Sequence, residues 1–347
     1  MIPQMIKLVL SFMVWSSFIY LSGISNEFSK IVFGLDEFPS TEDPFALFQR
    51  WSEKYEKVYE TPVEMEKRFQ IFKTNLNYIA EHNAKMPLAS YRLGPTKFAD
   101  LTPEEFSKIY LNTIPPNSSQ VEQHNYPTSV YRYSYVDYRD WGVVTSVKDQ
   151  GRCGSSWAFA TTAAYESAYL LAVKGTADFS EQQIIDCTSS KYDCNAGSVE
   201  EAFKWVKSNG GIASEASYPY TARKGNCQTK EKAVTIDGYR SVSPESEDHL
   251  AYMLTMNGPF VVVVHASATF SGYGGGVYND NDCSNSKFNH AVLLTGLLKV
   301  DGAEMWVIKN SWGTHWGEDG FMRMVKGINI CSIINSPVYI PTIHKYT

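Results

Sequence analysis

The hydrophobic residues between positions 64 and 83 recur at steps of three and four. They are Phe69, Phe72, Leu76 and Ile79. Residues at this spacing share one face of an α-helix, and charged residues occupy the opposite face here. The pattern predicts an amphipathic helix across residues 64–83.

Longer apolar stretches farther along predict buried elements. An alanine-rich stretch that follows residue 156 predicts a long helix, ending near Lys174 and Gly175, where glycine favours a helix C-terminus. The apolar run 292–296 predicts a strand, and the valine run 261–264 also indicates a sheet. Both helices and strands therefore contribute to the expected core.

The start of the chain has the pattern of a targeting segment. Lys7 is followed by about fifteen mostly apolar residues up to Gly23. A membrane span needs roughly 20 apolar residues, so this run is short for an anchor. Because Gly23 and Ser25 are small and offer a cleavage site, we expect residues 1–25 to be a secretory signal peptide. An uncleaved anchor is the alternative.

Charge and composition exclude some classes of protein. The chain has 347 residues, which suggests about two domains. Its 31 Lys plus Arg and 37 Asp plus Glu give a formal net charge of −6. This balance argues against a nucleic-acid-binding protein, whose contact surface is basic. Hydrophobic residues make up 44% and charged residues 20%, which is typical of a globular protein.

All six cysteines lie beyond residue 150. An even number in a secreted chain favours three disulfides, and the sequence alone leaves fifteen connectivities open. No two cysteines have C-x-x-C spacing, so we expect no zinc site and no other metal. The first third of the chain must fold without crosslinks, which suggests a separate and removable N-terminal region.

The predicted helix also carries six residues in a fixed register. They are Glu64, Arg68, Phe72, Asn75, Ile79 and Asn83. This arrangement resembles the pro-region motif of papain-family peptidases of the cathepsin L type. A second pro-region pattern of that family, G-x-N-x-F-x-D, is nearly reproduced between Gly94 and Asp100, with Thr96 in place of the asparagine.

The resemblance implies a domain order and a fold. An inhibitory pro-segment would cover residues 40–105, a linker 106–131 and a papain-like peptidase domain 132–347. Asn117, in the linker, begins an N-glycosylation acceptor sequence. The implied fold class is α+β: a helical subdomain and a β-barrel-like subdomain form a cleft, and the helical pro-segment blocks that cleft.

Further motifs resemble the catalytic machinery of the same family. Residues 149–159 match its nucleophile signature, in which a cysteine precedes Trp-Ala-Phe, but Ser156 stands at the cysteine position. His290 matches the catalytic histidine, and Asn310 matches the residue that orients its ring. By the same resemblance, the Gln150 side chain and the backbone N–H of Ser156 would bind the oxyanion.

Serine changes the chemistry expected at this position. A cysteine at a helix N-terminus beside a histidine can rest as a thiolate. A serine hydroxyl stays protonated, so His290 would have to remove its proton during attack. Asn310 is neutral and stabilises the resulting imidazolium less than a carboxylate would. We therefore expect proteolysis to be absent or strongly impaired.

The resemblance also assigns the cysteines and the peptide groove. Six cysteines of this family pair and a seventh is the nucleophile, so the chain keeps the six and lacks the seventh. The implied disulfides are Cys153–Cys194, Cys187–Cys227 and Cys283–Cys331. The residues implied to bind substrate are Gly197, Ser198, Val199, Phe288, Ala291, Trp312 and Ser336. Of these, Gly197 would hydrogen-bond extended peptide, and Trp312 would cover the bond between His290 and Asn310.

The resemblance implies no cofactor. The expected partners are a peptide or protein substrate in the cleft, the chain's own pro-segment and cystatin-like inhibitors, and the protein is expected to be a monomer. We expect it in the secretory pathway, either extracellular or in a lysosome or vacuole.

Our functional hypothesis is a peptide-binding pseudoprotease made as a zymogen. One alternative is residual hydrolysis by Ser156, His290 and Asn310, and another is ordinary cysteine-type activity if the natural protein has Cys at position 156. A third is resemblance to silicateins, which are papain relatives with serine at this site that condense silica. We rank it last because no serine-rich run lies near His290.

Overall fold

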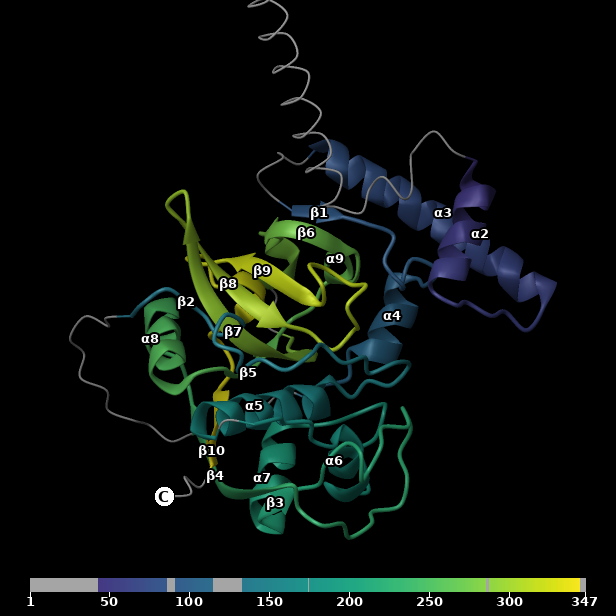
Figure 1. Ribbon diagram of the computed structural model, residues 1–347. Coiled ribbons are helices and arrows are strands. Elements are labelled where there is room, and N and C mark those ends of the chain that lie inside the picture. The colour runs from purple at the N-terminus through teal and green to yellow at the C-terminus, as the bar shows by residue number, and fades with distance from the viewer. Residues whose placement is uncertain (1–42, 86–90, 115–132, 174, 285–286, 344–347) are drawn as a thin grey trace, which may run out of the picture.

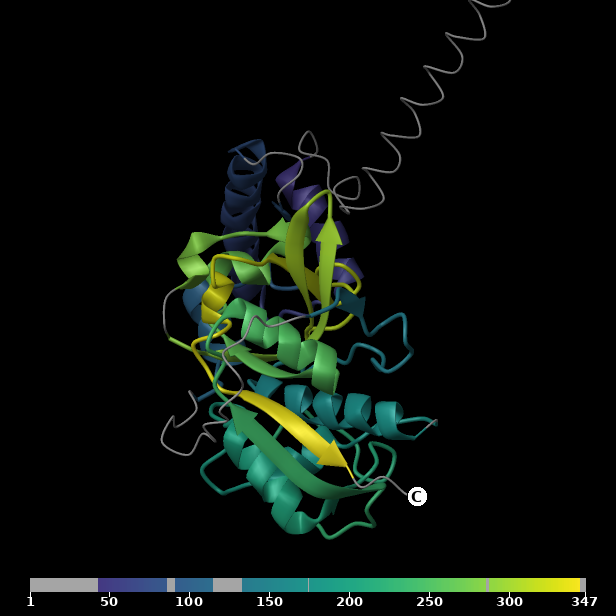
Figure 2. The ribbon, with the colours of Figure 1, turned by 90° about the vertical axis from the view of Figure 1, so that its left-hand side faces the viewer.

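The computed structural model describes residues 43–85, 91–114, 133–173, 175–284 and 287–343 (Figure 1). The expected signal peptide at residues 1–25 and the acceptor Asn117 lie outside these ranges. Within them, no helix is long and apolar enough to cross a membrane. Figure 2 shows that the N-terminal helices stand at the sheet end of the molecule, away from α7 (Val199–Asn209).

Two crossing helices form the start of the described chain. They are α2 (Pro44–Lys54) and α3 (Pro62–Lys85), and α3 confirms the helix predicted across residues 64–83. Buried aromatic side chains pack between them, among them Phe48, Trp51 and Phe72. The indole nitrogen of Trp51 also donates to two backbone carbonyls of the following loop, at 3.0 Å each. The pro-segment therefore has a small core of its own that needs no disulfide.

Helix α4 (Pro103–Tyr110) lies across the position where we expected the pro-segment to meet the linker. The helix begins with a capping box, in which Thr102 and Glu105 each bond the other's backbone N–H. This cap fixes the start of the helix before residue 106, so α4 runs across the junction that we expected at 105/106. Residues 112–114 then lie against the peptidase domain, where the backbone bonds Gly197 and Asn289. The first part of the predicted linker is therefore an ordered continuation of the pro-segment.

The helical subdomain is built around α5 (Ser156–Ala172), which packs with α6 (Glu181–Cys187) and α7. The first twelve residues of α5 are buried, because small alanine side chains allow neighbouring elements to approach closely. The helix ends at Ala172, near the end that Lys174 and Gly175 predicted. It is a central helix, most of which is buried.

The second subdomain is a mixed sheet with the order β1-β6-β9-β8-β7-β5-β10-β4-β3, and β2 pairs with β7. Helices α8 (Glu247–Asn257) and α9 (Ala268–Ser271) belong to it. Strand β1 comes from the pro-segment and pairs antiparallel with β6 of the peptidase domain. The strands are β1 (Tyr91–Leu93), β2 (Val136–Asp137), β3 (Gly211–Ile212), β4 (Val234–Val242), β5 (Phe260–Val264), β6 (Tyr273–Tyr278), β7 (His290–Val300), β8 (Ala303–Lys309), β9 (Phe321–Val325) and β10 (Val338–Ile343).

Three disulfides crosslink the peptidase domain. They are Cys153–Cys194, Cys187–Cys227 and Cys283–Cys331. Two lie in the helical subdomain, and the third joins two short 3₁₀ helices beside the sheet. Each closes a loop of 40 to 48 residues, which limits the conformations of the unfolded chain.

Arg68 provides a test of how the pro-segment is held together. Its guanidinium bonds Glu64 and Glu105 at 2.6 Å each and also donates to the backbone oxygen of Asp100 at 3.0 Å. Arg68→Met should therefore lower the free energy of unfolding of the full chain by about 1 to 3 kcal/mol. Lys73→Met, on the exposed side of the same helix, should leave the free energy of unfolding unchanged, as measured by urea unfolding. Equal unfolding midpoints for the two variants would contradict the assignment.

Candidate active site

Ser156 is the first residue of α5, and none of its surface is exposed. The loop before it is fixed to the adjacent turn, because Cys153 is bonded to Cys194 and the N–H of Gly154 donates to the Cys194 oxygen at 2.8 Å. Glycine fits at 154 because a Cβ there would lie 2.6 Å from that oxygen. The helix N-terminus therefore presents backbone N–H groups and the positive end of its dipole to the Ser156 hydroxyl.

His290 and Asn310 meet across two neighbouring strands. His290 begins β7, and Asn310 directly follows β8, which pairs antiparallel with β7. The Nε2 atom of His290 lies 2.9 Å from the Asn310 side-chain oxygen, which also accepts the N–H of Ser311 at 2.8 Å. The Trp312 ring lies 4.7 Å from the imidazole, and both rings are fully buried. The Trp312 ring therefore packs against the imidazole of this pair.

His290 is neutral in this state. Burial lowers the pKa of His290 to about 4, and the hydrogen bond that the ring donates to the Asn310 oxygen opposes this effect only in part. Within the described part of the chain, the Nδ1 atom of His290 has no hydrogen-bond partner. The Ser156 hydroxyl lies beside this strand, since the N–H of Ala291 points at its oxygen from 3.4 Å. The structure therefore brings Ser156, His290 and Asn310 together without a bond between Ser156 and His290.

Gln150 is held by the residue that follows Asn310. Its N–H donates to the backbone oxygen of Ser311 at 2.9 Å, and the Ser311 hydroxyl donates to the Gln150 side-chain oxygen at 2.7 Å. The amide nitrogen of Gln150 therefore faces the loop that leads to Ser156, and it donates to the Cys153 oxygen at 2.8 Å. The bond to Cys153 therefore occupies the amide donor of Gln150 in this state.

The residues expected to bind substrate lie in the helical subdomain, at the start of α7, and in the sheet subdomain, around β7. Gly197 hydrogen-bonds an extended segment through its backbone, and Ser198 caps α7 by accepting the N–H of Glu201. Val199, Phe288 and Ala291 contribute to one apolar cluster that also contains Trp157. The Ser336 hydroxyl is buried and donates to the adjacent backbone oxygen of Pro337.

Thr113 is a site residue that the sequence analysis missed. Its hydroxyl lies 2.9 Å from the Ser156 hydroxyl, and both groups are buried. Thr113 falls in the region that we had expected to be linker, three residues past the end of α4. No periodicity or motif marks it, so only the path of the chain could place it in the cleft.

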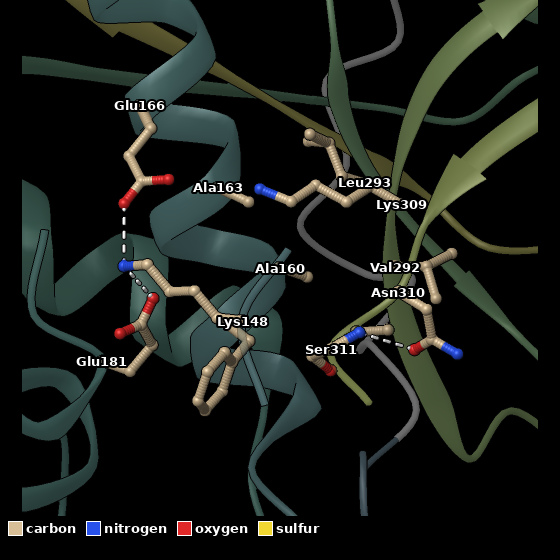
Figure 3. A pocket seen from close by; sticks show the side chains of 12 residues that line it. Lys148, Ala160, Ala163, Glu166, Glu181, Val292, Leu293, Lys309, Asn310 and Ser311 are labelled. Atoms are coloured by element: carbon tan, nitrogen blue, oxygen red, sulfur yellow. Dashed lines mark hydrogen bonds and ion pairs between the residues drawn. The ribbon is translucent and has the colours of Figure 1, made fainter. Parts of the chain in front are cut away.

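A cluster of buried charges lies behind the catalytic residues (Figure 3). Lys148 bonds Glu166 of α5 at 3.0 Å and Glu181 of α6 at 2.9 Å, and Lys309 reaches from β8 toward α5. Burial lowers the pKa of Lys309 to about 8, an effect that Glu166 opposes. A cavity of about 20 Å³, room for about one water molecule, separates these groups. Lys148 and Lys309 directly precede the segments of Gln150 and Asn310, so the cluster fixes both segments to the helical subdomain.

Comparison with known proteins identifies the family of this chain. The family described as Papain family cysteine protease matches residues 133–341, and the Cathepsin propeptide inhibitor domain matches residues 48–106.

Within the described residues, no group of three or more His, Cys, Asp or Glu side chains could hold a metal ion.

Curated relatives and solved structures indicate the same family. The thiol protease aleurain of Arabidopsis thaliana is 38% identical over 298 residues, which cover 84% of this chain and 83% of the relative. The digestive procathepsin L2 proteinase from Tenebrio molitor larval midgut has a TM-score of 0.80 at 36% identity and covers 87% of this chain and 100% of its own. A bromelain protease from Ananas comosus, with a TM-score of 0.57 at 39% identity, covers 60% of this chain and 98% of its own.

The chain therefore belongs to the papain family of cysteine proteases and carries the propeptide domain of cathepsins. The expected α+β fold, with a helical propeptide ahead of a papain-like domain, is confirmed.

The buried imidazole predicts a pH dependence of stability. Because the pKa of His290 is about 4 in the folded chain and about 6.5 when unfolded, the unfolded state binds its proton first as the pH falls. Acidification from pH 7 to 4.5 should therefore remove about 2 to 3 kcal/mol of stability through this residue alone. Urea unfolding of His290→Gln at the two pH values should show a smaller loss than the parent. The exposed His315→Gln variant should behave as the parent, and an unchanged loss in His290→Gln would contradict the prediction.

Gly197 predicts a packing constraint. A Cβ at this position would lie 1.9 Å from the indole nitrogen of Trp157, whose ring is fully buried and has no room to move. Gly197→Ala should therefore destabilise the full chain by about 1 to 3 kcal/mol. Gly94→Ala is the control, because no atom lies within 4 Å of a Cβ there. Thermal unfolding at the same midpoint for both variants would show that the Trp157 contact does not constrain position 197.

Proposed function

We propose that this chain is a peptide-binding member of the papain family in which proteolysis is absent or strongly impaired. The observation that carries the proposal is that all six cysteines are paired in disulfides, so the chain has no thiol to act as a nucleophile. The relative from Arabidopsis thaliana is named a thiol protease, an activity that depends on a thiolate. Here the corresponding position is Ser156.

The surroundings of Ser156 support the proposal that catalysis is weak or absent. A serine nucleophile needs a base that accepts its proton in the transition state. While the pro-segment is in place, burial lowers the pKa of His290 to about 4 and makes the imidazole a weak base. Asn310, the residue bonded to the ring, carries no charge with which to stabilise an imidazolium. Each of these properties raises the barrier to attack by the hydroxyl.

The cleft itself supports peptide binding. The extended residues 112–114 lie in it, and both backbone polar groups of Gly197 bond this segment. Main-chain hydrogen bonds of this kind recognise any extended peptide, and neighbouring side-chain pockets add selectivity. The apolar cluster of Val199, Phe288 and Ala291 would favour an apolar side chain in such a peptide. These backbone bonds form without any reaction at Ser156.

The same proposal includes the compartment of the zymogen and the removal of its pro-segment. Three disulfides suit an oxidising compartment, in keeping with a signal peptide at residues 1–25 and entry into the secretory pathway. The destination would be the extracellular space or a lysosome or vacuole. Because Ser156 would not support self-cleavage, another protease would have to remove the pro-segment. Cystatin-like inhibitors would be candidate partners of the exposed groove, and the protein would act as a monomer.

Restoring the thiol tests the proposal. The full chain is folded, cut in the linker by an added protease and freed of its pro-segment, for the parent and for Ser156→Cys and Ser156→Ala. Hydrolysis is followed with a fluorogenic peptide that has an apolar residue two positions before the fluorophore. Ser156→Cys should exceed the parent by at least about 10³-fold, because a nucleophile contributes at least that much in such enzymes. The parent should match Ser156→Ala.

Two results would overturn the proposal. Clear turnover by the parent above Ser156→Ala would make Ser156 a working nucleophile and the protein a serine-type hydrolase. Absence of activity in Ser156→Cys, with folding and peptide binding intact, would show that the catalytic geometry is lost for reasons other than the missing sulfur.

A further inference from the structure

The pro-segment crosses the cleft through a short extended stretch that bonds both subdomains. On the helical side, the N–H of Gly197 donates to the oxygen of Asn112 at 3.1 Å, and the N–H of Ile114 donates to the oxygen of Gly197 at 2.6 Å. On the sheet side, the N–H of Thr113 donates to the oxygen of Asn289 at 3.1 Å. The backbone of the stretch is therefore held at both walls, and the side chain of its central residue is fixed in position.

That side chain meets the nucleophile position. Thr113 is 4% exposed and Ser156 is not exposed, and their hydroxyl oxygens lie 2.9 Å apart, so that either hydroxyl can donate. Two hydroxyls in a dry site satisfy each other, and removal of one leaves the other buried with a weakened set of partners. Among the residues that the structure describes, the only other hydrogen bond to the Ser156 side-chain oxygen is the long one from the N–H of Ala291, at 3.4 Å.

The distance suits oxygen and not sulfur. A thiol is a weak hydrogen-bond donor and acceptor, and its larger atom needs more room than a hydroxyl. A cysteine at position 156 would push the Thr113 hydroxyl away or lose the bond. The contact between Thr113 and Ser156 is thus specific to the residue that distinguishes this chain from a thiol protease.

We infer that Ser156 is a recognition residue, which selects extended segments that present a serine or threonine hydroxyl at the centre of the cleft. Thr113 of the pro-segment is the built-in ligand of this kind. The inference rests on the proposed function, since a groove that binds without turnover leaves the hydroxyl free for recognition. It names the class of ligand: an extended peptide held by Gly197 and Asn289 through its backbone, with a hydroxyl opposite Ser156.

A double-mutant cycle on the full chain tests this inference. The folded chain is cut once in the linker by an added protease, and the release of the noncovalently held pro-segment is measured after dilution. The variants are Thr113→Val, Ser156→Ala and the combination of both. Each single change should speed release about 10-fold, because it leaves one buried hydroxyl without its partner. The double variant should be at least about 5-fold slower than the product of the single effects predicts.

Matched variants separate the hydroxyl bond from general packing. Thr113→Ser keeps the hydroxyl and should release the pro-segment within about twofold of the parent rate. Thr74→Val removes a hydroxyl from the exposed side of α3 and should have no effect. Ser156→Cys should release faster than the parent, because its thiol replaces the hydroxyl poorly. Thermal unfolding of the uncut variants shows whether each one folds.

A peptide in trans provides a second measurement that does not depend on folding of the pro-segment variants. A synthetic peptide of residues 108–116 is compared with its valine counterpart at position 113, using protein freed of its pro-segment. The parent should bind the threonine peptide about 10-fold more tightly, and Ser156→Ala should lose this preference.

Independent, multiplicative effects of the two substitutions, or equal binding of both peptides by the parent, would overturn the inference. These outcomes are separable from those of the proposed function. Hydrolysis by the parent above that of Ser156→Ala would contradict the proposed function, whatever the double-mutant cycle shows. If the parent is inactive and the two substitutions show no coupling, only the recognition of a hydroxyl is contradicted.

Discussion

The packing of α5 against the strands of the sheet subdomain is the interaction on which the site depends. Alanine side chains of this helix meet valine and leucine side chains of β5 and β7 in one apolar cluster. Because α5 begins at Ser156 and β7 begins at His290, this close packing brings the hydroxyl and the imidazole to the same end of the interface. A bulkier helix face would separate the two elements, and the catalytic residues would separate with them. The composition of the helix is therefore a condition for the site and not merely for stability.

Buried charges reinforce the same interface from the other side. Lys148 pairs with Glu166 and Glu181. Lys309 donates to the hydroxyl of Thr145, which in turn bonds Glu166. Removing one partner of such a buried group costs more than the pair contributes, because the remaining charge is left in a poor solvent. The cluster therefore opposes any shift of the two subdomains relative to each other. It also explains why Gln150 and Asn310 keep their positions although they lie in irregular segments.

The parts that could be predicted from the sequence differ physically from those that could not. The repeated apolar spacing predicts the helix over residues 64–83. Ser156, His290 and Asn310 are marked by short motifs, because their chemistry requires particular residue types. Thr113 has neither property, because its role comes from where the chain runs after α4. The helix that crosses the predicted boundary at 105/106 was missed for the same reason. The charged cluster is equally hidden, since its four members are scattered from residue 148 to residue 309 and each has an ordinary local context.

Burial of the imidazole decides between sulfur and oxygen at position 156. Burial lowers the pKa of His290 because it removes water from the charged ring, and a cysteine would compensate by forming a thiolate beside it. The two charges of such a pair stabilise each other in a medium of low dielectric constant. The hydroxyl of a serine stays protonated, so the ring of His290 stays neutral. The hydroxyl then forms a hydrogen bond with a neutral group. Thr113 is such a partner, and its contact with Ser156 follows from the same desolvation that would favour an ion pair in a thiol protease.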